Sequence, residues 1–66
     1  MHRYTLKGLR TLLRQLSFSQ DSINLMVQDA VDGVEDVSFI PVPGGLPYSI
    51  TYDDSDGMFI TKPVSS

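Results

Sequence analysis

The stretch TLKGLRTLLRQLSFSQDSINLMVQDAVDG, residues 5–33, decides the fold, because apolar side chains recur in it every three or four positions. This spacing predicts two amphipathic helices, at about 5–16 and 20–32. Ser19 is a suitable N-cap for the second helix, and Gly33 is a suitable stop after it. The predicted apolar faces are Leu6, Leu9, Leu12, Leu13 and Leu16 on the first helix, and Ile23, Met26, Val27, Ala30 and Val31 on the second.

Beyond residue 33 the apolar pattern changes to a period of two, which is typical of strands. It predicts strands at about 37–41, 46–52 and 58–62. The fold class is therefore α+β, with the two helices packed on a three-stranded antiparallel meander whose middle strand is central. Within 46–52, we expect Leu46 to share the inner face of the sheet with Tyr48, Ile50 and Tyr52.

The third predicted strand raises two further expectations. As the last strand of the meander, it offers an unpaired edge to which another chain can add. Phe59 is expected on the opposite side of the sheet from Met58 and Ile60, facing solvent with Ser49 and Thr51.

Length and composition limit the classes of protein. The chain has 66 residues, which predicts a single domain, residues 1–66, with a thin core. It has no cysteine, which excludes disulfides and thiolate zinc sites. No apolar run approaches the length of a membrane span, so we expect no membrane partner and a cytoplasmic location. A thin core also favours a second subunit, so a homodimer is one hypothesis.

Charge is distributed unevenly along the sequence. Four of the five basic residues precede every acid: Arg3, Lys7, Arg10 and Arg14. From residue 21 onward the sequence has eight acids and one basic residue. A basic helix joined to an acidic body can pair with itself, with a second copy or with an outside polyanion. Two acids near the end of the second helix, Asp29 and Asp32, oppose the helix dipole. A tight antiparallel hairpin would place them beside Arg3 and Lys7, and this internal pairing is our first interpretation.

The leading functional hypothesis is a small non-enzymatic interaction or regulatory module of the inhibitor or adaptor type. It would bind another protein, basic in character, through acidic and exposed apolar residues. Leu25 points away from its helix's apolar face and is the first candidate anchor. The predicted partner-binding residues are Leu25, Asp29, Asp32, Glu35, Asp36 and Phe59.

The segment from Leu12 to Met26 resembles the helix-turn-helix of DNA-binding proteins in its apolar spacing and short turn. It departs from that pattern at Leu13, where a small residue is usual, and at Ser17, where glycine is usual. The alternative hypothesis that the resemblance implies is a winged-helix-like DNA-binding regulator, using segment 12–27 with a basic first helix. Its nucleic-acid-binding residues would be Arg3, Lys7, Arg10, Arg14, Gln20, Ser22 and Asn24. Against it, the second helix has no Arg or Lys to neutralise phosphates.

Catalysis finds little support in the sequence. His2 is the only histidine, and its place at the N-terminus does not fix it beside a substrate. The acidic loop 52–57 matches a calcium loop at Asp54, Asp56 and Gly57 but lacks the first and last carboxylate ligands. We therefore interpret it as a polar turn, and expect no catalytic residues, no metal and no cofactor.

Overall fold

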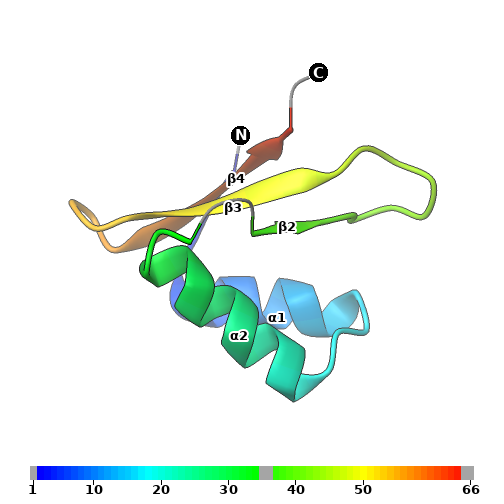
Figure 1. The fold of residues 1–66 in the computed structure, drawn as a ribbon, viewed down its shortest axis with the longest axis horizontal. Coiled ribbons are helices and arrows are strands. Elements are labelled where there is room, and N and C mark those ends of the chain that lie inside the picture. Colours follow the sequence, from blue (N-terminus) through cyan, green and yellow to red (C-terminus); the bar gives the residue numbers. More distant parts are fainter. Residues whose placement is uncertain (1, 35–36, 65–66) are drawn as a thin grey trace.

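The computed structural model describes residues 2–34 and 37–64. Over these residues it has two helices against one face of a four-stranded antiparallel sheet (Figure 1), which confirms the α+β class. The elements are β1 (His2–Tyr4), α1 (Leu6–Gln15), α2 (Gln20–Val31), β2 (Ser38–Phe39), β3 (Tyr48–Asp53) and β4 (Met58–Pro63). The strand order is β1-β4-β3-β2, so the predicted middle strand does lie between two neighbours.

Each helix begins directly after a residue that caps it, and for the second helix this is the predicted Ser19. The hydroxyls of Thr5 and Ser19 accept hydrogen bonds from the backbone N–H groups of Gly8, at 3.0 Å, and Ser22, at 3.2 Å. These bonds satisfy donors that the first helical turn leaves without partners. Gly33 ends α2 at a φ of 74°, as expected of a glycine stop.

Helix α1 ends in the same way, but without glycine. Ser17 has a φ of 71°, in the left-handed region, and its N–H donates to the carbonyl of Arg14 at 3.0 Å. The N–H of Phe18 reaches back to Leu13 at 3.2 Å, which completes a Schellman-type ending. The turn therefore has the backbone form for which glycine is usual, at the cost of strain in a serine.

The core lies between the helices and the sheet. Its buried apolar residues are Leu9, Leu13, Ile23, Val27, Ala30, Phe39, Ile50 and Phe59. The predicted helical faces are thus confirmed at their centres and wrong at their margins, because Leu6 and Val31 are each 45% exposed. Leu46, predicted to face the core, precedes β3 and is 69% exposed.

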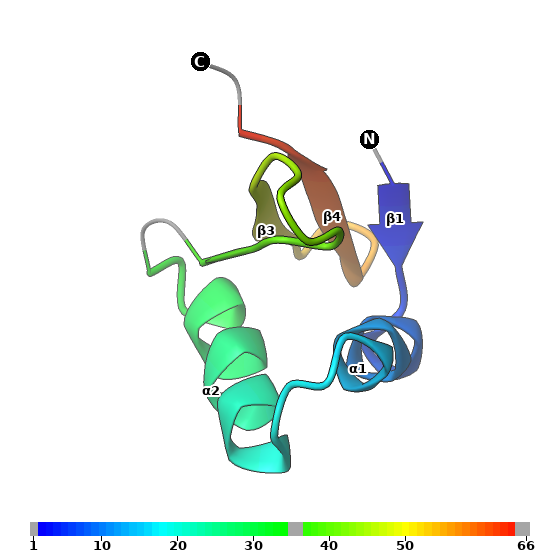
Figure 2. The same ribbon diagram turned by 90° about the vertical axis from the view of Figure 1, so that its right-hand side faces the viewer.

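The sheet has one strand more than predicted. Strand β1 pairs with β4, and Figure 2 shows it beside β4 at the end of the sheet. The predicted unpaired edge on 58–62 is therefore wrong, because β1 covers it. At the other end of the sheet, β2 has only Ser38 and Phe39, shorter than the predicted 37–41.

The predicted orientation of β4 is also wrong. Phe59 is 2% exposed and pairs across the sheet with Tyr52, so it faces the helices. Met58 and Ile60 take the opposite side, as the period of two requires. The reason is register: Asp53 pairs with Met58 across a short loop, which fixes the side on which each β4 residue lies.

Candidate functional site

The exposed side of α2 carries acids around one leucine. Leu25 is 65% exposed, which confirms that it lies off the apolar face. Asp21, Asp29 and Asp32 lie four or seven positions from it, so they share its side of the helix. We call these four residues the α2 acidic face. Asp32 also accepts a hydrogen bond from the Gln28 amide at 3.0 Å.

In the described part of the chain, no cation forms an ion pair with the α2 acidic face. Within residues 2–34 and 37–64, both ion pairs of the structure involve Arg3, and neither reaches α2. Asp21 suits the positive end of the helix dipole, but Asp29 and Asp32 lie at the negative end. The structure thus keeps two carboxylates where the helix itself disfavours them.

Arg3 lies far from the position that internal pairing requires. It belongs to β1, donates to Asp56, and lies 3.7 Å from an Asp53 oxygen. The predicted pairing of Arg3 and Lys7 with Asp29 and Asp32 is therefore wrong. The pairing of β1 with β4 moves Arg3 to the side of the sheet away from the helices, with Ile60.

The two helices are joined by a polar cluster beside the turn. Arg10 Nη1 donates to Asn24 Oδ1 at 2.9 Å, and Arg14 Nη2 donates to Gln20 Oε1 at 3.1 Å. Gln20 Nε2 also donates to Asn24 Oδ1 at 2.9 Å. We call these four residues the helix seam. It brings together four of the predicted nucleic-acid-binding residues.

The other three of those residues lie elsewhere. Lys7 is exposed near the start of α1, and Arg3 is bound at the sheet. Ser22 is half-buried, and its hydroxyl accepts from Ser19 at 3.0 Å, so it serves the start of α2. The structure therefore does not gather the seven predicted residues into one surface.

The loop between β3 and β4 is held by its own acids. Asp53 accepts from the hydroxyl of Ser55 at 2.6 Å and from its N–H at 3.1 Å. These hydrogen bonds, with a contribution from Arg3, lower the pKa of Asp53 below its usual value. Asp56 accepts from the N–H of Met58 at 3.2 Å. The loop is a polar turn built from aspartates, as predicted.

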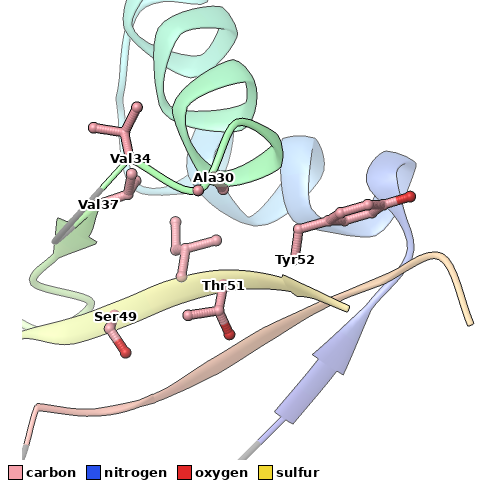
Figure 3. A pocket seen from close by; sticks show the side chains of 8 residues that line it. Ala30, Val34, Val37, Ser49, Thr51 and Tyr52 are labelled. Atoms are coloured by element: carbon pink, nitrogen blue, oxygen red, sulfur yellow. The ribbon is translucent and has the colours of Figure 1, made fainter. Parts of the chain in front are cut away.

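The surface is hollowed beside the end of α2. This hollow, of about 340 Å³, is lined by Ala30, Gly33, Val34, Val37, Ser49, Ile50, Thr51 and Tyr52. Figure 3 shows the side chains of Ser49 and Thr51 pointing away from α2, so the hollow is an open rim along β3. Among the described residues of its lining there is no carboxylate, imidazole or amine.

A second hollow, of about 250 Å³, lies between α1 and the sheet. It includes His2 and Tyr4, whose ring centroids are 6.4 Å apart. His2 belongs to β1, where it pairs with Thr61. The expectation that the N-terminus leaves this histidine unfixed is therefore wrong. The remaining lining of the hollow is Leu12, Phe39, Pro41, Val42, Tyr48 and Thr61. Among the described residues of this lining, the other titratable groups are Tyr4 and Tyr48.

The structure brings some of the predicted partner-binding residues together and separates others. Leu25, Asp29 and Asp32 lie together on α2, whereas Phe59 is buried and is no anchor. Glu35 and Asp36 lie outside the described residues. Asp21 was not among the predicted residues, although its spacing of four from Leu25 is the signal that places it on this face.

In the described ranges, no helix has the length and apolar character of a membrane span, and no three metal-ligating side chains gather. Comparison with family models, curated proteins and solved structures finds no match to this chain.

Proposed function

We propose that this chain is a protein-interaction module that binds a basic surface of another protein through the α2 acidic face. Leu25 is the apolar anchor, with Asp21 before it and Asp29 and Asp32 after it along the same side of the helix. An exposed leucine with charged residues on both sides has the composition of a small interface, which is apolar at its centre and polar at its rim.

One observation supports this proposal above the others. Asp29 and Asp32 are held at the unfavourable end of a helix dipole, with no cation nearby in the described part of the chain. Burying their charge against a Lys or Arg of a partner would relieve that conflict. The free chain therefore keeps an electrostatic strain that complex formation removes.

Affinity capture with matched variants tests the proposal. Wild type, L25A, D29K/D32K and L46A are immobilised and exposed to nuclease-treated lysate of the source cells. Leu46 is the control because it is 69% exposed, close to the 65% of Leu25, but lies outside the helices. We expect wild type and L46A to retain the same basic protein, and L25A and D29K/D32K to lose it. Equal retention by all four variants would contradict the proposal.

A second candidate function is nucleic-acid binding, which the helix seam favours. Arg10 and Arg14 lie directly beside Gln20 and Asn24 at the start of α2, where a helix-turn-helix presents its base-reading residues. Two features oppose it. The outer side of α2 is acidic, and the β3–β4 hairpin, which would be the wing, ends in Asp54 and Asp56.

Gel retardation of duplex DNA separates the two candidate functions. DNA binding predicts retardation that weakens steeply between 50 and 200 mM salt and is lost in R10E/R14E. Lys62 lies on β4, so K62E is the matched control for the loss of a cation. Absence of retardation at micromolar protein and low salt would eliminate this candidate.

A further inference from the structure

We propose that two copies of this chain associate through the exposed sides of their helix pairs, α1 of one copy on α2 of the other. The inference rests on the proposed function, because it names the basic surface that the α2 acidic face binds. That surface is the row of cations on α1.

The two helices carry opposite charges, and neither set is neutralised within the described chain. Lys7, Arg10 and Arg14 of α1 have no carboxylate at ion-pair distance in the described ranges. The carboxylates of Asp21, Asp29 and Asp32 on α2 likewise have no cation there. The first helix therefore carries three positive charges and the second three negative charges, and the two helices meet at neutral amides of the helix seam, which accept from Arg10 and Arg14.

Each helix also carries charge at its unfavourable end. Lys7 is in the first turn of α1, near the positive end of that helix dipole, where the turn has no acid. Asp29 and Asp32 have the converse problem on α2, whose last turn has no basic residue. Contact between α1 of one copy and α2 of the other would relieve both conflicts together.

Two-fold symmetry makes this contact self-complementary. A surface with one cationic half and one anionic half matches its own copy after a half-turn about an axis between the halves. Each α1–α2 contact then occurs twice, and like charges are kept apart. A contact between two α2 helices would instead oppose acid to acid.

Apolar residues and surface area agree with such an interface. Leu25 on α2 is 65% exposed, and Leu6 and Val31 are each 45% exposed on the margins of the helices. A stable interface buries about 800 Å² on each partner. That is roughly a fifth of the 4502 Å² that the chain exposes, and the helix pair is one of its two layers. Because the core is small, association would also stabilise the folded chain by mass action.

Sedimentation equilibrium of charge-reversed variants tests the inference. One variant is K7E/R14E, and the other is D29K/D32K. Lys7, Arg14 and Asp32 are exposed, and Asp29 is only half-buried, so neither variant is expected to unfold. Arg10 and its bond to Asn24 stay intact in both. The control is K62E, which changes a cation on the sheet.

Wild type and K62E are expected to be dimers at 100 µM and 50 mM salt, and to dissociate at 500 mM salt. Each charge-reversed variant alone should have a dissociation constant at least tenfold weaker. Their 1:1 mixture should recover the dimer mass, because each variant now complements the other. Circular dichroism on every sample checks that the helices are retained.

Two results would overturn the inference: a monomeric wild type at 100 µM and 50 mM salt, or folded variants whose mixture stays monomeric. If the wild type is monomeric but still captures a basic protein that D29K/D32K loses, this inference fails and the proposed function stands. If the wild type is monomeric and instead retards DNA, both this inference and the proposed function fail, and nucleic-acid binding replaces them.

Discussion

The sheet and the helix pair differ in whether the charges on their outward sides are neutralised. On the sheet, Arg3 binds Asp56 and lies 3.7 Å from Asp53, so cation and acids neutralise each other. On the helices, Lys7 and Asp29 have no oppositely charged partner in the described part of the chain. The difference separates two uses of surface charge. The sheet charges hold a turn, whereas we propose that the helix charges are neutralised by another molecule.

The largest expected effect tests which side of the sheet faces outward. Phe59 is 2% exposed and packs against Tyr52, with ring centroids 4.9 Å apart. F59A should lower the free energy of unfolding by about 3–5 kcal/mol, because it leaves a cavity in a small core. M58A, on the other side of β4, should cost less than half as much. Urea denaturation measures both, and equal losses would break the assignment of the two sides.

The next prediction concerns the charges on the helix side. In the monomer, D29N/D32N should raise the free energy of unfolding by about 0.3–1 kcal/mol per site at low ionic strength, because it removes negative charge from the negative end of α2. D21N is the matched control at the opposite end, where loss of charge should destabilise by a similar amount. Urea denaturation in 20 and 500 mM salt checks the signs and their screening. A destabilised D29N/D32N monomer would mean that a cation of the same chain neutralises these carboxylates.

The turn that orients the helices gives a smaller effect. Ser17 has a φ of 71°, which costs an L-residue about 1 kcal/mol relative to glycine. S17G should therefore stabilise the fold by about that amount, less the extra entropy that glycine gains on unfolding. Thermal unfolding measures the change, and S19G, which removes an N-cap instead, should shift the midpoint downward. If S17G instead destabilises the fold, the serine side chain adds more to the stability of the fold than the positive φ takes away.

The smallest effect is a titration on the sheet side. The hydrogen bonds from Ser55, aided by Arg3, lower the pKa of Asp53 in the folded state below its usual value of 3.8. Asp53 therefore contributes stability above that pH, and this is lost as the pH falls through the lower, folded-state value. S55A should raise the pKa of Asp53 toward 3.8, as followed by NMR of the side-chain carboxyl. An unchanged pKa in S55A would assign the shift to another group.

Local signals predicted the helices well. Ser19 and Gly33 affect only the nearest turn of α2, so the sequence is enough to place both ends of that helix. The exposure of Leu25 also follows from the helical period alone. These features are the ones on which the α2 acidic face depends, so most of the candidate site was predicted.

The features that were missed depend on contacts between distant parts of the chain. The three residues of β1 carry no alternating pattern, and they become a strand because they pair with β4, 55 to 59 positions away along the chain. The side of β4 was wrong because it has apolar residues on both faces, so only the register with β3 decides it. Arg3 follows β1 to the sheet, which is why its pairing with Asp56 was not predicted.

The most direct test of the claim that two copies associate through their helix pairs is a dilution series followed by two-dimensional ¹H–¹⁵N NMR. Spectra of the wild type at 500 and 10 µM in 50 mM salt are compared residue by residue. The predicted result is shift changes confined to the exposed sides of α1 and α2, centred on Lys7, Arg14, Leu25 and Asp29, and abolished at 500 mM salt. Changes centred instead on the exposed apolar residues Ile40, Val42 and Leu46, or spectra that do not change with concentration, would contradict it.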